Sequence, residues 1–176
     1  MATIASWLFG SAAERRQFET DQPVLSPVPQ LLASAASWRP KADRVLIGTG
    51  LALTGDASSA RPALVILERP AAGLPAVAAV VLGAAGNYRP ALRTAGCLLY
   101  RNGLIAGTGA PGVLAGDPVT ALTAAVDAMP DEPADDQLIV LGSITPPVAG
   151  SPGDRFSLTV AGLGSVRLRL TEEGAR

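Results

Sequence analysis

The sequence predicts an α+β fold in which helices come first and a mostly β body with one inserted helix follows. Two observations carry this prediction. From Arg44 onward the apolar runs "RVLIGTGLALT", "PALVILE" and "AVAAVVLG" are short and bounded by Gly, Pro and Ser, as buried strands are. A single longer run, which begins after Asp117, has helix signals at both of its ends.

The first 43 residues are expected to form a helical segment that packs on a body made of residues 44–176. We expect a first helix over Ile4–Phe18, with Trp7, Leu8 and Phe9 as its apolar anchors and Gly10 as a position that weakens it. Prolines then interrupt the chain. Ser26 followed by Pro27 is typical of a helix start, so a second helix is expected to continue to Trp38.

Two hairpins and one helix have clear signals in the body. The pair Asn102-Gly103 supplies two residues that tolerate positive φ, as a type I′ turn between the strands of "GCLLYRNGLIAGTG" requires. A second hairpin is expected in "RFSLTVAGLGSVRLRL", where apolar and polar residues alternate. Asp117 is the expected N-cap of the helix, Pro118 fits its first position, and Pro130 ends it.

Composition limits the classes of function. The chain has 176 residues, 48% hydrophobic and 16% charged, which predicts one ordered domain. Its mean hydropathy is +0.32, so we expect apolar surface to be covered in a homo-oligomer or by a related subunit. A net charge of -1 argues against nucleic acid as a partner, because phosphate binding needs a concentrated basic face. The arginines of "RLR", Arg167–Arg169, are interpreted as a solvated face.

Nothing in the sequence predicts a membrane span or a secretory signal. The longest uncharged apolar stretch, "GLPAVAAVVLGAAG", is shorter than the ~20 residues of a spanning helix and contains a proline. At the N-terminus the charges follow the apolar residues, which is the reverse of a secretory signal. We therefore expect a cytoplasmic protein with Cys97 buried in a strand. The absence of histidine excludes Ser-His-Asp and Cys-His arrangements.

The segment from Cys97 to Leu170 resembles the C-terminal part of the fumarylacetoacetate hydrolase superfamily. "LLYRNGLIAGTGAPGVLAGDPVTALTAAV", "LIVLGSITPPVAGSPGDRF" and "GLGSVRLRL" are similar, in order and spacing, to the branch of 2-keto-4-pentenoate hydratase and 4-oxalocrotonate decarboxylase. Upstream, "DRVLIGTGLALT" looks like the G-x-K-x-G-L-T strand of that branch, and "PALVILERP" looks like its P-A-L-E-V-V-D-S-R strand. The resemblance implies a mixed β-roll around a polar pocket and a hydratase-like lyase chemistry.

The resemblance also implies a metal site from which this sequence departs. In the family, three carboxylates hold Mg²⁺ or Mn²⁺, the ion chelates a 2-oxo acid, and a lysine assists. Here Gly50 stands at the lysine position and Val65 at the position of one glutamate ligand. The other two ligands would fall in the interval that contains only "GDASSAR". We therefore expect a shortened family member without Mg²⁺, Mn²⁺, Zn²⁺ or another cofactor.

Three residues remain as candidates for a metal-free site. Glu68 aligns with the aspartate of the family strand and would act as a general base if an apolar pocket raised its pKa; the alternative is a strand-end salt bridge. Ser143 and Thr145 are expected on one side of a strand end, where the resemblance implies that they seat a substrate carboxylate. The alternative is that their hydroxyls satisfy local backbone groups. Tyr88 and Tyr100 are further proton donors to consider.

Two functions of different classes follow from these residues. In the first, the protein binds a small 2-oxo or enol acid and performs metal-independent lyase or isomerase chemistry, with Glu68 or a tyrosine moving the proton. In the second, it is a pseudoenzyme: a non-catalytic partner subunit of a full-length family enzyme or of another complex. Ancestry favours the first function, whereas the loss of the ligands and the lysine favours the second.

Overall fold

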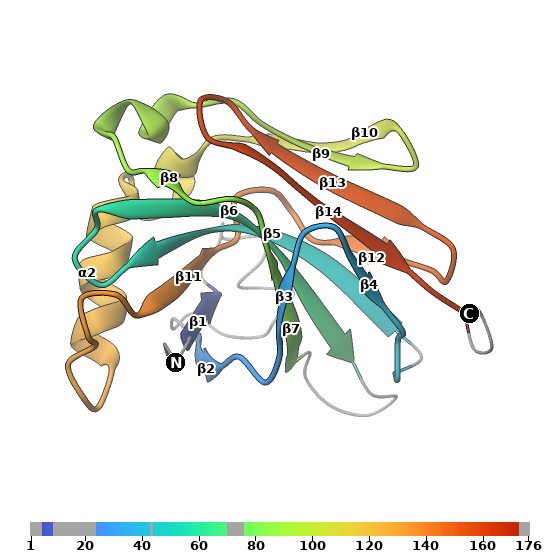
Figure 1. The fold of residues 1–176 in the computed structure, drawn as a ribbon, viewed down its shortest axis with the longest axis horizontal. Coiled ribbons are helices and arrows are strands. Elements are labelled where there is room, and N and C mark those ends of the chain that lie inside the picture. The colour runs from blue at the N-terminus through green and yellow to red at the C-terminus, as the bar shows by residue number, and fades with distance from the viewer. Residues whose placement is uncertain (1–4, 9–23, 43, 70–75, 173–176) are drawn as a thin grey trace.

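Two mixed β-sheets and one α-helix make up the part of the chain that the computed structural model describes, which is residues 5–8, 24–42, 44–69 and 76–172, with side chains from residue 25 onward (Figure 1). The strands are β1 (Ala5–Leu8), β2 (Val24–Pro27), β3 (Leu31–Ala33), β4 (Ala36–Trp38), β5 (Arg44–Thr54), β6 (Ser59–Arg69), β7 (Ala76–Leu82), β8 (Gly86–Asn87), β9 (Cys97–Arg101), β10 (Leu104–Gly109), β11 (Leu138–Gly142), β12 (Val148–Gly150), β13 (Arg155–Val160) and β14 (Gly164–Leu170). The helices are α2 (Pro118–Ala128) and the short 3₁₀ segments η1 (Pro90–Thr94) and η2 (Pro111–Val113).

The larger sheet has the strand order β2-β1-β11-β5-β6-β7-β3, with β12 also paired to β5 and β8 to β6. The smaller sheet has the order β10-β9-β13-β14-β4 and lies across the larger one (Figure 1). Most neighbours are antiparallel, but β1 runs parallel to β11, β3 to β7 and β4 to β14. The predicted α+β architecture, a mostly β body with one inserted helix, is confirmed.

The prediction of N-terminal helices is wrong for every part of this segment that the structure describes. Residues 5–8 form β1, and the second expected helix is replaced by β3 and β4; residues 9–18 of the first lie outside the described residues. The physical reason is long-range pairing. Leu31 aligns with Val80 of β7, and Ala36 aligns with Leu168 of β14, so the sheets satisfy these backbones and override the local preference.

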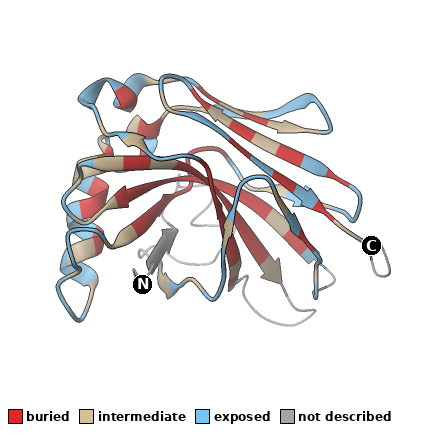
Figure 2. Cartoon of the chain, viewed as in Figure 1, coloured by how far each residue is buried: buried red, intermediate tan, exposed pale blue. Residues whose placement is uncertain are grey.

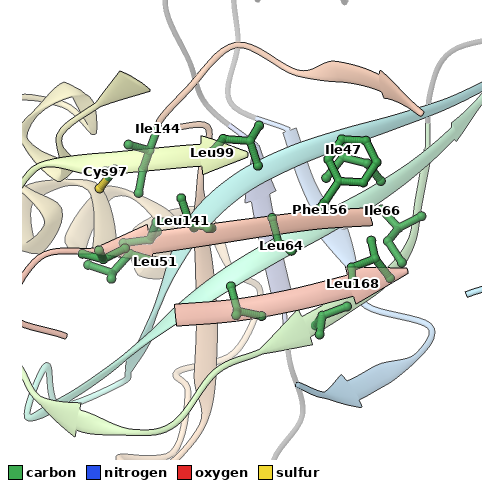
Figure 3. Packing of buried hydrophobic residues seen from close by; sticks show 14 of the residues in the cluster. Ile47, Leu51, Leu64, Ile66, Cys97, Leu99, Leu141, Ile144, Phe156 and Leu168 are labelled. Carbon is green, nitrogen blue, oxygen red and sulfur yellow. The ribbon is translucent and has the colours of Figure 1, made fainter. Parts of the chain in front are cut away.

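The main core lies between the two sheets. Side chains alternate along a strand, so one face of β5 and β6 points at the smaller sheet. Figure 3 shows these residues meeting Leu99, Phe156 and Leu168 of the smaller sheet. The contributing side chains of the larger sheet include Ile47, Leu51, Leu64, Ile66 and Leu141.

A second apolar cluster covers the opposite face of β5, β6 and β7. Its buried members are Ala52, Ala63, Val65, Leu67, Val77, Val80, Leu82 and Val140. Strand β6 is therefore buried on both faces, as the continuous band of buried residues in Figure 2 shows. Burial on both faces explains why the sequence of this strand is a continuous apolar run instead of an alternating one.

The turn and cap predictions are confirmed. Asn102 and Gly103 have φ of 53° and 83° between β9 and β10, as a type I′ hairpin requires. The Asp117 side chain accepts a hydrogen bond of 3.1 Å from the Val119 N–H at the start of α2, and Pro118 occupies the first turn. None of the described helices is long and apolar enough to cross a membrane.

Candidate functional site

Ser143 and Thr145 lie in the loop that follows β11, immediately after the pairing of Gly142 with Gly50 of β5. Strand β11 ends at Gly142, so the two residues are not in strand register. Both are buried, with 8% and 1% of their surface exposed. The Ser143 hydroxyl donates to the Thr145 carbonyl, so its proton is directed into the loop itself.

Thr49 is the residue that holds this loop. The Thr145 N–H donates to Thr49 Oγ1 at 2.8 Å, the two threonine hydroxyls are 2.9 Å apart, and the Ile144 N–H donates to the Thr49 carbonyl at 3.1 Å. Thr49 is fully buried. Sequence reasoning missed it; the available signal was a polar residue between two glycines in an otherwise apolar strand. We call Thr49, Ser143 and Thr145 the hydroxyl cluster.

Three glycines let the surrounding backbone pack closely against the hydroxyl cluster and the residues next to it. A Cβ on Gly107 of β10 would lie 3.2 Å from the Thr145 Cβ, and one on Gly109 would lie 2.6 Å from the Ile144 carbonyl oxygen. On the β5 side, a Cβ on Gly50 would lie 2.7 Å from the Leu141 carbonyl oxygen. At Gly50 and Gly109 the backbone approach is too close for any side chain, whereas at Gly107 the Thr145 side chain would have to shift by a few tenths of an ångström.

Glu68 is engaged in two hydrogen bonds at the far end of β6. Its Oε1 accepts from the Trp38 indole N–H at 3.0 Å and from the Lys41 backbone N–H at 3.0 Å. Trp38 belongs to β4 of the smaller sheet, so this carboxylate joins the two sheets. Its described partners give Glu68 a structural role in holding the segment around Trp38.

The structure does not bring Glu68 together with Ser143 and Thr145. Glu68 is opposite Val45 in β5, whereas the residue before Ser143 is opposite Gly50. Five positions along a strand span roughly 17 Å. A single small substrate therefore does not reach both the carboxylate and the two hydroxyls.

The positions that the resemblance assigns to metal chemistry do not fit a divalent ion. Val65 is fully buried in the second apolar cluster, opposite Gly48 on one side and Val80 on the other. Gly50 has no room for a side chain in this backbone. No group of three His, Cys, Asp or Glu side chains comes together among residues 5–8, 24–42, 44–69 and 76–172. Hard divalent ions take six or more oxygen ligands, which these apolar positions do not offer.

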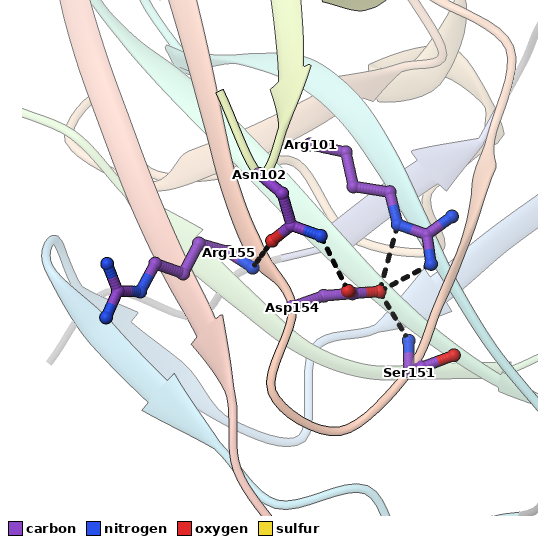
Figure 4. Close-up of polar contacts among 5 residues, drawn as sticks. All are labelled: Arg101, Asn102, Ser151, Asp154 and Arg155. Carbon is purple, nitrogen blue, oxygen red and sulfur yellow. Dashed lines mark hydrogen bonds and ion pairs between the residues drawn. The ribbon is translucent and has the colours of Figure 1, made fainter. Parts of the chain in front are cut away.

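Asp154 organises a second polar cluster that the sequence analysis did not identify (Figure 4). Its carboxylate accepts from Arg101 Nε at 2.9 Å, from Asn102 Nδ2 at 2.8 Å and from the Ser151 N–H at 2.8 Å. Asn102 Oδ1 in turn accepts from the Arg155 N–H at 2.9 Å. We call Asp154 and these donors, Arg101, Asn102 and Ser151, the carboxylate cluster.

The electrostatics of the carboxylate cluster favour the ionised form of Asp154. Desolvation raises the pKa of Asp154, but the hydrogen bonds from Asn102 and Ser151 and the Arg101 charge outweigh it, so the pKa lies below its usual value. The charged carboxylate fastens the β9–β10 turn to the loop before β13. The sequence signal was the Pro-Gly-Asp turn just before an alternating strand.

Cys97 carries a thiol, a potential nucleophile, and Tyr88 and Tyr100 are the proton donors that the sequence raised as further candidates. Burial raises the pKa of the Cys97 thiol to about 11, so it stays protonated at neutral pH. The Tyr88 hydroxyl donates to Asp117 at 3.2 Å, and burial followed by the Asp117 charge raises the pKa of this phenol. Tyr100 lies half-buried on the smaller sheet, opposite Ser157.

No protein-family model and no curated protein matches this chain. Solved structures do match. The 4-oxalocrotonate decarboxylase of Pseudomonas putida G7, complexed with magnesium and adipate, has a TM-score of 0.81 at 18% identity, over 97% of this chain and 78% of that one. The fumarylpyruvate hydrolase of Pseudomonas aeruginosa, in complex with Mn²⁺ and pyruvate, has a TM-score of 0.72 at 13% identity, over 97% and 89%.

A third structure gives the same result. The 5-carboxymethyl-2-hydroxymuconate delta-isomerase of Mycobacterium smegmatis has a TM-score of 0.70 at 15% identity, over 99% of this chain and 80% of that one. At these identities the likeness concerns the fold. The resemblance predicted from the sequence is confirmed at that level: the chain has the fold of the fumarylacetoacetate hydrolase superfamily.

Proposed function

We propose that this protein is a fumarylacetoacetate hydrolase-like chain without the divalent-metal site, and that it serves as a non-catalytic subunit of an oligomer. One observation carries the proposal. The two positions that correspond to the lysine and to a glutamate ligand, Gly50 and Val65, are occupied by close packing: Val65 is fully buried among apolar side chains, and a Cβ on Gly50 would lie 2.7 Å from the Leu141 carbonyl oxygen.

The placement of the other candidate residues supports the same function. The hydroxyls of Ser143 and Thr145 already have partners inside the protein. Glu68 accepts two hydrogen bonds that hold Trp38 and Lys41. A general base acts within hydrogen-bond reach of the proton that it removes. Glu68 is too far from the hydroxyl cluster to act on an acid bound there.

The surface that suits a subunit contact is the outer edge of β10. This strand ends the smaller sheet, so its outer backbone groups have no strand partner among the described residues. Leu104 and Ile105 are 75% and 61% exposed, and the strand carries no charge. An uncharged apolar edge strand is a ready template for another chain. The partner that we propose is a second copy of this chain.

The oligomeric state tests the proposed contact. We expect the purified protein to sediment as a dimer or larger species, and the Leu104→Lys, Ile105→Lys double variant to sediment as a folded monomer whose melting temperature no longer depends on protein concentration. Val113→Lys is the matched control, because Val113 is 56% exposed but lies in η2 outside the β10 edge. A monomeric wild type, or a double variant that stays associated, would refute the contact.

The absence of catalysis has its own test. We expect no exchange of the methyl protons of pyruvate in D₂O, with or without added Mg²⁺, and no stabilisation by Mg²⁺ in thermal unfolding. A metal that binds only the folded protein at 100 times its dissociation constant would stabilise it by about 2.7 kcal/mol. Exchange catalysed above the solvent rate, or a saturable stabilisation by Mg²⁺, would overturn the non-catalytic assignment.

The second candidate is metal-independent lyase or isomerase chemistry on a small 2-oxo or enol acid. The observation in its favour is the fold, which is shared with enzymes that were solved with adipate and with pyruvate. In this function Ser143 and Thr145 would turn their hydroxyls to a carboxylate. Saturable binding of pyruvate by the wild type, abolished in the Ser143→Ala, Thr145→Val double variant, would favour this candidate over the first.

A further inference from the structure

Three arginines lie together on the outer face of the smaller sheet. Arg155 of β13 is directly opposite Arg169 of β14, and Arg167, two residues earlier on β14, is opposite Ser157. All three are exposed, because the alternation of the strands turns Phe156 and Leu168 into the core and the arginines outward. Within the described part of the chain, no carboxylate forms an ion pair with any of the three.

A groove of 510 Å³ lies over these arginines. Its lining includes Arg155, Arg167 and Arg169 together with the hydroxyl-bearing residues Ser37, Tyr100 and Ser157. This volume is within the range of small-molecule sites, which is roughly 300–1,000 Å³. The groove therefore combines three fixed positive charges with neutral hydrogen-bond donors on one rigid sheet surface.

The arrangement of these charges is unfavourable for the protein alone. Like charges that face each other directly across antiparallel strands are destabilising, and Arg155 and Arg169 are such a pair. The neighbouring Arg101 is different, because it forms an ion pair of 2.7 Å with Asp154. Figure 4 shows that the Arg155 side chain extends away from that carboxylate. Among the described residues, Arg101 therefore has a carboxylate partner, whereas the three arginines of the groove have none.

We propose that this groove is a binding site for a small, multiply charged anion that bears carboxylate or phosphoryl groups. The planar guanidinium fork matches the paired oxygens of both groups, and an anion between Arg155 and Arg169 converts their repulsion into attraction. Tyr100 and Ser157 then meet the remaining oxygens. Three arginines in a chain of net charge -1 are too few for a nucleic acid tract, so the ligand is small.

The site is independent of the proposed subunit function. It occupies the outer face of the smaller sheet, whereas the hydroxyl cluster lies on the core side of β5. The groove reaches Gly103, next to Leu104 of the proposed contact, but its three arginines lie on β13 and β14, so anion binding is tested by variants that leave β10 unchanged.

Titration calorimetry at constant ionic strength tests the proposal with citrate and with pyrophosphate as probes. We expect saturable binding of at least one probe, and binding at least about tenfold weaker in the Arg155→Gln, Arg169→Gln double variant, because each charged hydrogen bond lost is worth a tenfold factor or more. The control is Arg93→Gln, an exposed arginine of η1 outside the groove, which should bind as the wild type does. Preference for one probe identifies the anionic group.

Stability provides the second measurement. In low-salt buffer without multivalent anions, the double variant should melt at the same temperature as the wild type or higher, because the opposed charges are gone. Citrate or pyrophosphate should raise the melting temperature of the wild type alone. The proposal fails if neither probe binds the wild type, if both proteins bind equally, or if Arg93→Gln weakens binding to the same extent.

Discussion

The hydroxyl cluster and the carboxylate cluster both fix a loop in place, but they do so by different chemistry. Thr49, Ser143 and Thr145 form a neutral network inside the molecule. Asp154 instead carries a charge that Arg101 neutralises, near the surface of the smaller sheet. The first cluster stands where the resemblance implies substrate binding, yet its hydrogen bonds are internal. A residue that matches a family motif is therefore no evidence of a binding site when its hydrogen-bonding groups already have partners inside the protein.

The largest expected effect comes from placing a side chain at Gly50, next to Thr49 of the hydroxyl cluster. Gly50→Lys would restore the residue type that the resemblance implies, but its Cβ would lie 2.7 Å from the Leu141 carbonyl oxygen. We expect a loss of about 3 kcal/mol or more in the free energy of unfolding by urea, because this backbone contact does not yield cheaply. Gly48→Ala is the control: its Cβ makes only ordinary contacts of 3.8 Å, so a change within about 1 kcal/mol is expected. A stable Gly50→Lys protein would contradict the close packing of β5 on β11.

The next effect concerns the carboxylate cluster. Asp154→Ala leaves Arg101, Asn102 and the Ser151 N–H without their acceptor. We expect a loss of about 2–3 kcal/mol in the free energy of unfolding; the Arg101 side chain is 38% exposed, so water recovers part of the cost. Denaturation by urea at pH 7 measures it. A loss below about 0.5 kcal/mol would mean that the cluster is incidental.

The contribution of Asp154 should also depend on pH, which separates the two clusters. Its pKa in the folded protein is below the ordinary value of about 4. The stability that the ionised carboxylate provides is therefore present above about pH 4 and is lost as the pH falls through the lower folded pKa. The stability difference between wild type and Asp154→Asn should shrink in this acid range. The corresponding difference for a hydroxyl-cluster variant should not change.

Thr145→Val should have a smaller effect than Asp154→Ala, since no charge is involved. The substitution keeps the volume of the side chain and removes the hydroxyl that lies 2.9 Å from Thr49 Oγ1. Because Thr49 is fully buried, we expect a loss of about 1–2 kcal/mol in the free energy of unfolding. Thr159→Val removes a hydroxyl contact to Ser165 on the outer face of the smaller sheet and should cost no more than about 0.5 kcal/mol. Equal losses in the two variants would contradict the special role of the hydroxyl cluster.

The features that could be predicted from the sequence are those whose determinants are local. The Asn102-Gly103 turn and the Asp117 cap are each defined by residues within one turn of the chain, and the structure confirms both. Long-range partners are invisible to such reasoning. Strand β3 is a strand because it pairs with β7, and the partner of Thr145 is Thr49, 96 positions away. Local propensity therefore favoured helices before residue 43. The internal hydrogen bonds of Ser143 and Thr145 could not be predicted either.

Asp117 carries a charge but accepts only from neutral donors among its described partners, and its variants should affect stability less than Asp154→Ala does. Its carboxylate accepts from the Val119 N–H at 3.1 Å and from the Tyr88 hydroxyl at 3.2 Å, with no cation among its described partners. Asp117→Ala removes the cap and should cost about 1 kcal/mol, whereas Asp117→Asn keeps an acceptor oxygen and should be nearly neutral.

The phenol of Tyr88 reports the charge at Asp117 independently of stability. Burial first, and then the negative charge of Asp117, raises the pKa of Tyr88 above its ordinary value. Asp117→Asn removes the charge and leaves the burial, so the alkaline titration of tyrosine absorbance should shift to lower pH while the unfolding curve stays in place. In the Asp154 cluster, the same Asp→Asn change should lower stability, because Arg101 loses a charged partner. If both variants behaved alike, charge would not be what distinguishes the carboxylate cluster from a neutral network.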